Sequence, residues 1–299
     1  MSSIPIARIT ALALTACFLV PAPLALAAES PAKAEGPERA FTPADLFKLD
    51  GVTDPQIAPD GARIVYVRSS GDIMTDKDVP SIWLVDAASG AQRPLVAGPG
   101  AHFSPRWSPD GKRLAYVSSD GTGAPQLHVL WLASGADVKI TELPDSPGAI
   151  AWSPDGRQIA YTMRVPGEPM ELGSQPADKP EGAKWAEPLQ VIDRVTYRFD
   201  GAGYLPAGFD HIFVVSADGG APRQVTFGQF DDGGPLSWSP DGRRIVFTAN
   251  RHADWQRDIN NSEVYSVDVA SGAVMALTSR QGPDGAAFAG RQAYRLYRL

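Results

Sequence analysis

The sequence predicts an all-β protein, and three observations lead to this prediction. The 299 residues include 29 Gly and 27 Pro, well above average usage, so turns must be frequent. Short runs of alternating apolar residues, separated by turn residues such as Asp-Gly and Ser-Gly, recur along the chain. No stretch has the period and length of a core helix, apart from the short segment 43–49. Hydrophobic residues make up 43% of the chain, enough to fill the core of a large domain.

Charge and cysteine content exclude several classes of protein. The chain has 27 Lys and Arg against 34 Asp and Glu, a net charge of −7, which argues against a nucleic-acid partner. Its one cysteine, Cys17, excludes an internal disulfide framework and a zinc site built from cysteines. We expect no cofactor.

The first residues have the pattern of an export signal. Arg8 precedes an apolar run that ends in Ala25-Leu26-Ala27, a small-residue cleavage site. We predict a signal peptide over residues 1–27, a linker over residues 28–40, and therefore export to the bacterial periplasm or secretion.

The same segment has two other interpretations besides a cleaved signal. Leu14-Thr15-Ala16-Cys17 is similar to a lipoprotein signal, and cleavage there would leave Cys17 lipidated. A membrane anchor is disfavoured because Pro21 and Pro23 interrupt the apolar run, so we expect no membrane span.

A six-residue segment that ends in Pro-Asp-Gly recurs four times. Its copies occupy residues 56–61, 106–111, 151–156 and 237–242, and the last three contain Trp-Ser-Pro-Asp-Gly. Pro fixes φ, Asp bonds the nearby backbone and Gly takes a positive φ, a combination that predicts a hairpin turn. Four copies at repeat spacing indicate turn chemistry rather than a catalytic Ser–Asp pair.

Each copy is followed by the pattern of three more strands. Four short antiparallel strands per unit of about 45 residues is the size of a β-propeller blade. We therefore predict an incomplete β-propeller over residues 41–299, with four four-stranded antiparallel blades and a partial fifth. The blades are expected at residues 52–98, 103–145, 149–228 with an insertion at 166–210, 235–279, and 280–299 for the partial blade.

The insertion carries the strongest candidate for a binding surface. Its segment 191–205 predicts a hairpin, on which Arg194, Arg198 and Tyr204 would help to bind a peptide terminus. The favoured interpretation of these three side chains is that they form cross-strand pairs on the hairpin. Trp185 and Trp255 lie outside the repeat positions and are candidates for an interface.

Other titratable residues give no catalytic or metal site. The four histidines have no metal-ligand spacing, and we expect them in strand packing or exposed loops. They are His102, His128, His211 and His252. The paired carboxylates Asp231-Asp232 and Asp76/Asp78 fall in predicted turns, where we expect them to be solvated.

The Trp-Ser-Pro-Asp-Gly repeats resemble those of TolB-type periplasmic proteins and of the prolyl oligopeptidase family of serine peptidases. Three further segments resemble the dipeptidyl-peptidase and acylaminoacyl-peptidase branch of the second group. They are the entry at 41–49, the insertion segment 193–201 and the stretch 223–228. The resemblance covers residues 41–285.

The resemblance implies a two-domain enzyme whose propeller caps a C-terminal α/β-hydrolase domain and gates short peptides to it, and the predicted signal peptide adds export. That domain would hold the catalytic Ser, Asp and His, but this chain has no Gly-x-Ser-x-Gly segment, so no catalytic residue is carried over. We expect a peptide substrate for the full-length parent and no activity for this chain alone. The alternative is a non-enzymatic, TolB-like propeller that binds a protein partner. A polysaccharide enzyme would need clustered metal or acid–base ligands, which the sequence lacks.

The last residues depart from the repeat. The spacing from Thr278 places the next Trp-Ser-Pro-Asp-Gly segment at 289 or 290, where the chain has Ala289-Gly290-Arg291. We interpret this as a reading frame lost near Gly285, which would expose blade edges to self-association. A genuine short C-terminal strand is the alternative.

Overall fold

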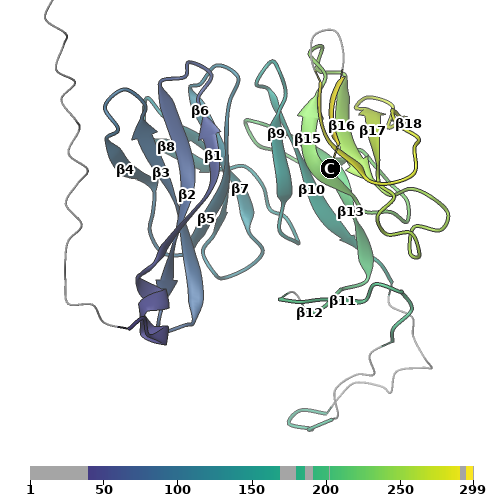
Figure 1. The fold of residues 1–299 in the computed structure, drawn as a ribbon, viewed down its shortest axis with the longest axis horizontal. Coiled ribbons are helices and arrows are strands. Elements are labelled where there is room, and N and C mark those ends of the chain that lie inside the picture. The colour runs from purple at the N-terminus through teal and green to yellow at the C-terminus, as the bar shows by residue number, and fades with distance from the viewer. Residues whose placement is uncertain (1–39, 169–179, 186–190, 202, 290–293, 299) are drawn as a thin grey trace, which may run out of the picture. The chain divides into compact units, whose positions relative to one another are not determined.

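The computed structural model describes residues 40–168, 180–185, 191–201, 203–289 and 294–298. The predicted signal peptide, and the predicted linker up to residue 39, lie outside this range. Residues 42–299 form one compact unit, to which the description of the fold refers. Most strands of this unit belong to four-stranded antiparallel sheets (Figure 1).

A short 3₁₀ helix, η1 (Pro43–Lys48), leads into the first blade. Pro43 is its first residue, and the backbone N–H of Thr42 donates to Asp45 Oδ2 at 2.9 Å, which gives the helix a capping box. The strands of the first blade are β1 (Asp50–Ile57), β2 (Arg63–Asp72), β3 (Lys77–Asp86) and β4 (Gln92–Val96).

Three further blades repeat this antiparallel order. The second contains β5 (Ala101–Trp107), β6 (Arg113–Ser119), β7 (Gln126–Trp131) and β8 (Ala136–Lys139). The third contains β9 (Gly148–Trp152), β10 (Gln158–Pro166), β13 (Gly208–Ser216) and β14 (Arg223–Gln224). The fourth contains β15 (Asp232–Trp238), β16 (Arg244–Ala249), β17 (Glu263–Asp268) and β18 (Val274–Ala276).

A two-stranded sheet follows the fourth blade. It pairs β19 (Asp284–Ala289) with β20 (Tyr294–Arg298), and β19 contacts β15 and β16. The part of the chain that the structure describes thus holds four four-stranded blades and a two-stranded part of a fifth. This confirms the predicted all-β fold with four-stranded antiparallel blades.

The Pro-Asp-Gly turns have the chemistry that the repeat predicts. In the third blade, Ser153 Oγ donates to Asp155 Oδ1 at 2.6 Å, and the same carboxylate accepts the backbone N–H of Arg157 at 3.0 Å. Gly156 has φ of 67°, a conformation that favours glycine. Equivalent bonds join Ser108 to Asp110 and Ser239 to Asp241.

The repeated tryptophan fastens one blade to the blade before it. Trp107 Nε1 donates to Gln56 O at 3.0 Å, and Trp152 Nε1 donates to Arg106 O at 2.9 Å. Trp238 Nε1 makes the same bond to Ala151 O at 3.1 Å. The three acceptors occupy one repeat position, so the same bond joins each described pair of successive four-stranded blades.

An arginine after the turn completes this fastening at two of the three boundaries. Arg63 donates to Gly111 O at 3.2 Å and lies over the Trp107 ring, with the guanidinium carbon 5.1 Å from the centroid. Arg113 donates to Gly156 O at 2.6 Å and lies 4.8 Å over Trp152. We call the indole bond and this arginine together the inter-blade clamp.

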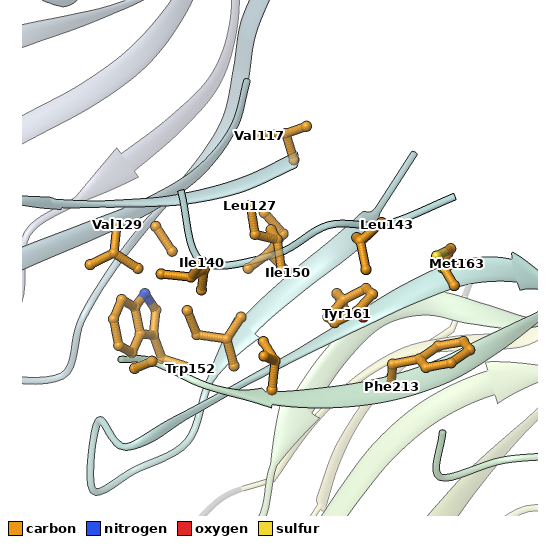
Figure 2. Close-up of a cluster of buried hydrophobic side chains, with 14 residues drawn as sticks. Val117, Leu127, Val129, Ile140, Leu143, Ile150, Trp152, Tyr161, Met163 and Phe213 are labelled. Carbon is orange, nitrogen blue, oxygen red and sulfur yellow. The ribbon is translucent and has the colours of Figure 1, made fainter. Parts of the chain in front are cut away.

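The hydrophobic core is divided among the boundaries between blades. The largest cluster lies between the second and third blades and includes Val117, Leu127, Trp152, Tyr161 and Phe213 (Figure 2). A second cluster joins the third and fourth blades, and a third joins the first and second. Since each cluster spans two neighbouring sheets, a blade is stabilised mainly by packing against the next one.

Candidate functional site

The insertion in the third blade leaves and re-enters the sheet through a narrow neck. The last residue of β10, Pro166, pairs with the first residue of β13, Gly208. Gly208 has φ of 111°, and a Cβ there would lie 2.1 Å from the Val165 carbonyl oxygen. No other residue fits at this crossing without a shift of the backbone.

Two arginines bind the carbonyl groups of the neck. Arg164 Nη1 donates to Pro206 O at 2.9 Å and to Gly208 O at 3.2 Å. Arg194, from the insertion itself, donates through Nη2 to Gly208 O at 3.0 Å and lies 4.3 Å over the Phe209 ring. The neck is therefore held by both the blade and the insertion.

Carboxylates surround Arg164 at the neck. Its Nε lies 3.4 Å from Asp210 Oδ1, and its Nη2 lies 3.8 Å from Asp231 Oδ1. Burial raises the pKa of Asp210; Arg164 opposes this rise, and the carboxylates of Asp231 and Asp145 add to it. The neck thus places two carboxylates, those of Asp210 and Asp231, beside the single guanidinium of Arg164.

The insertion also contacts the fourth blade, through the loop 250–262 between β16 and β17. The backbone N–H of Val195 donates to Gln256 Oε1 at 3.1 Å. Beside this bond, Phe209 at the start of β13 packs edge-on against Trp255 of the same loop, with ring centroids 5.9 Å apart. The Val195 bond gives the insertion a second point of attachment.

Beyond these attachments lies a short hairpin, in which β11 (Arg198–Phe199) pairs with β12 (Gly203–Tyr204). The sequence predicts a strand over 191–199, but in the structure only Arg198–Phe199 are a strand. The residues before them do not pair with a second strand, because Arg194 binds the neck and Val195 binds the loop 250–262. Arg198 and Tyr204 are direct cross-strand neighbours, and the guanidinium lies 5.9 Å over the Tyr204 ring. Tyr197 stacks on Tyr204 with centroids 6.0 Å apart.

The structure separates the three residues that the sequence singled out here. Arg194 has the structural role described for the neck. Arg198 and Tyr204 form the predicted cross-strand pair, but both are exposed, and so is Tyr197. Of the two non-repeat tryptophans, Trp255 packs against the base of the insertion, whereas Trp185 is 46% exposed.

Asp232 was predicted to be solvated in a turn, and this is wrong. It begins β15 and is fully buried. Arg251 binds its carboxylate with two nitrogens, Nε at 2.8 Å and Nη2 at 2.7 Å, and His211 Nδ1 lies 3.3 Å from Oδ2. No sequence motif indicates this cluster, because Arg251 and His211 lie 19 and 21 residues from Asp232, in a loop and on another strand. Asp231, Asp76 and Asp78 are exposed as expected.

The four histidines are distributed over three blades. His102 Nδ1 lies 3.0 Å from Ser118 Oγ, and burial lowers its pKa. His128 Nδ1 lies 3.3 Å from Asp137 Oδ1, and His252 Nε2 lies 3.8 Å from Oε1 of the buried Glu263. Among the described residues, no group of three or more His, Cys, Asp or Glu side chains is placed to hold a metal ion.

A cavity of about 500 Å³ lies along the first strands of the four blades, at their turn ends. Its walls include Trp107, Trp152 and Leu236, and its one cationic side chain, Arg106, is paired with Asp54 at 2.7 Å. Asp54 reaches Arg106 from a β-bulge, where its φ is 48°. The hydroxyl of Ser108, which also lines the cavity, donates to Asp110 Oδ1 in the Pro-Asp-Gly turn, so the described lining offers mainly apolar packing.

No helix in the described part of the chain is long and apolar enough to cross a membrane.

Two family models match the chain in succession. Residues 49–172 match the TolB beta propeller domain, and residues 183–298 match the dipeptidyl peptidase IV N-terminal region. Both matches agree with the blades and the insertion described above.

Relatives with names that include an enzymatic activity match over most of the chain. The chain is 31% identical to the uncharacterized peptidase YuxL of Bacillus subtilis over 213 residues, 71% of this chain and 32% of the relative. It is 26% identical to dipeptidyl-peptidase 5 of Porphyromonas gingivalis, covering 82% of this chain and 36% of the relative. The chain thus spans about a third of the length of these relatives.

Solved structures support the same fold. The acylaminoacyl peptidase of Pyrococcus horikoshii matches 78% of this chain and 33% of its own, with a TM-score of 0.58 and 17% identity. Repeats, fold and relatives agree that the chain belongs to the prolyl oligopeptidase family of serine peptidases, as the N-terminal β-propeller region of such a protein.

Proposed function

We propose that this chain is the substrate-gating propeller of an exported serine peptidase that cleaves short peptides, as a dipeptidyl or acylaminoacyl peptidase. In this proposal the catalytic Ser, Asp and His belong to a hydrolase domain outside the 299 residues. The names of the relatives support the substrate class, since they describe peptidases.

The observation that carries the proposal is the attachment of the insertion. Arg164 and Arg194 hold its neck, and the loop 250–262 holds its base, so a long segment is fixed at two points and yet extends beyond the sheets. Long insertions on a rigid scaffold are where binding residues concentrate. An insertion fixed in this way can restrict which peptides approach a neighbouring catalytic domain.

The encoding DNA provides the first test. We would read it beyond codon 299 in all three frames. Resumed Trp-Ser-Pro-Asp-Gly repeats, followed by a Gly-x-Ser-x-Gly segment between a strand and a helix, would support the proposal. If no frame contains them, the peptidase function is wrong for this chain and a partner-binding propeller becomes the better explanation.

Two measurements on the protein test the remaining parts. The purified 299-residue chain should not cleave dipeptidyl or N-acylaminoacyl chromogenic substrates, and turnover by this chain would contradict the proposed location of the triad. Export predicts that the mature protein from the periplasm begins at Ala28. An N-terminus at Met1 would contradict it.

A further inference from the structure

Arg198 differs from the other arginine of the insertion because its guanidinium makes no described hydrogen bond to the protein, whereas that of Arg194 binds a backbone carbonyl. Arg194 is half-buried and its guanidinium donates to the Gly208 carbonyl. Arg198 is exposed, and among the described residues no carboxylate lies within ion-pair distance of it. In a chain with a net charge of −7, a cation without such a partner is available to an anionic ligand.

An aromatic surface adjoins this cation. Tyr197 and Tyr204 stack with an interplanar angle of 29°, yet they remain 43% and 53% exposed. A stacked pair that keeps half of its surface in water can pack a further apolar or aromatic group. Because Arg198 lies over the Tyr204 ring, the guanidinium and the aromatic surface are presented side by side.

The attachments of the insertion reduce the entropic cost of binding at this surface. The backbone N–H of Leu205 donates to Tyr197 O at 2.8 Å, which closes the hairpin at its base. Three residues before Tyr197, Arg194 binds the neck. On the other side of the hairpin, Arg164 of β10 donates to the Pro206 carbonyl at 2.9 Å. Since the hairpin is held on both sides, little ordering is needed when a ligand binds.

We infer that Tyr197, Arg198 and Tyr204 form a docking site for the C-terminal end of a short peptide whose last residue is aromatic or large and apolar. The guanidinium binds the terminal carboxylate in a bidentate manner, and the last side chain packs on the two tyrosine rings. The inference rests on the proposed function only in taking a peptide as the ligand.

Binding of defined peptides to the full chain tests this inference. The probes are acetyl-Ala-Ala-Phe with a free carboxylate, the same peptide amidated at its C-terminus, and amidated acetyl-Ala-Ala-Glu. Dissociation constants would be measured by titration calorimetry and by chemical-shift changes. We expect the free acid to bind about fivefold more tightly than its amide, the effect of one exposed ion pair. The Glu peptide should bind as weakly as the amide.

Variants connect this preference to the proposed residues. Arg198→Gln should remove the difference between acid and amide, Arg198→Lys should keep part of it, and Tyr204→Leu should weaken both peptides. Arg93→Gln is the matched control, since Arg93 is exposed on β4 and, among the described residues, its guanidinium bonds the neighbouring Pro94 carbonyl alone. A thermal melt of each variant checks that it is folded.

The outcomes distinguish this inference from the proposed function. Equal binding of acid and amide, an unchanged preference in Arg198→Gln, equally tight binding of the Glu peptide, or no binding of the free acid would each overturn the docking site. None of these results depends on whether a hydrolase segment is encoded downstream. Conversely, absence of that segment would leave the peptide titrations fully interpretable.

Discussion

An aromatic ring occupies the middle of the second strand in every four-stranded blade, as Tyr66, Tyr116, Tyr161 or Phe247. The first two hydroxyls donate to residues of the fourth strand, Tyr66 to Gln92 and Tyr116 to Asp137. Tyr161 is buried in the cluster of Figure 2, and its hydroxyl has no hydrogen-bond partner in the described structure. In that blade the register brings Pro222 to the position of the acceptor.

This difference predicts opposite effects for the same substitution. Tyr161→Phe removes a buried hydroxyl that lacks a partner and should raise the free energy of unfolding by about 1 kcal/mol. Tyr116→Phe removes a hydrogen bond to a carboxylate and should lower it by about 1–2 kcal/mol. Urea denaturation of both variants measures the effects, and destabilisation by Tyr161→Phe would show that its hydroxyl has a partner in solution.

Asp232 is a fully buried, ion-paired carboxylate of the fourth blade. Asp232→Asn keeps the shape of the side chain but leaves the half-buried Arg251 without its carboxylate. This change should lower the free energy of unfolding by about 3 kcal/mol. Asp231→Asn is the matched control, because Asp231 is exposed and an amide oxygen can still accept the Asp210 N–H. In chemical denaturation, the free energy of unfolding of the control should lie within about 0.5 kcal/mol of that of the parent chain. Equal losses in both variants would argue against the Asp232–Arg251 pair.

The inter-blade clamp is complete at two boundaries between blades and lacks its arginine at the third. The position of Arg63 and Arg113 is occupied in the third blade by Gln158, which is exposed and makes no described contact with Trp238. Gln158→Arg should place a guanidinium over the Trp238 ring and near the Gly242 carbonyl. We expect the free energy of unfolding, measured by urea denaturation, to rise by about 0.5–1 kcal/mol. Gln158→Lys, which lacks the planar fork, is the control and should gain less.

The Pro-Asp-Gly turns make stability depend on pH. Hydrogen bonds from the Ser153 hydroxyl and from the Arg157 backbone N–H lower the pKa of Asp155 below its ordinary value of 3.8. A lowered pKa in the folded state contributes stability above the ordinary pKa, and this contribution is lost as the pH falls through the folded value.

A substitution in one turn isolates this contribution. Asp155→Asn should lower the melting temperature at pH 7, and the difference from the parent chain should shrink as the pH falls below about 4. Thermal melts at pH 7, 5 and 3 measure it, with Asp78→Asn, at an exposed position of β3, as a control whose difference from the parent chain should not shrink in acid. A difference that grows in acid would contradict the assigned direction of the pKa shift.

At the scale of the whole molecule, the blades are joined in series by the tryptophan bonds. Trp152→Phe removes the hydrogen bond to the Arg106 carbonyl and replaces the indole under Arg113 with a ring that binds a cation less strongly. It should lower the free energy of unfolding by about 1–2 kcal/mol. Trp83→Phe is the matched control, because Trp83 Nε1 bonds Ser81 within its own blade. Hydrogen exchange should show reduced protection on both sides of the boundary between the second and third blades in Trp152→Phe only. Loss confined to one blade would contradict the clamp.

The repeat predicts much of this architecture because the turn chemistry is local. Ser153, Asp155 and Gly156 act within five residues, so their pattern is visible in the sequence. The partners of Trp152 and Trp238 lie 46 and 87 residues away, and nothing in a single segment indicates which carbonyl an indole will bind. The role of Arg194 was ambiguous for the same reason, since its acceptor lies across the neck.

The series arrangement of the clamp has a mechanical consequence. When force is applied to the ends of residues 42–299, each boundary between the four-stranded blades resists through an indole–carbonyl bond, the cluster beside it and, at two of the three boundaries, the arginine of the clamp. Links in series yield one after another, so stretching should produce a staircase of separate rupture events. Each step should release the length of one blade, which gives the propeller a graded, spring-like resistance to extension.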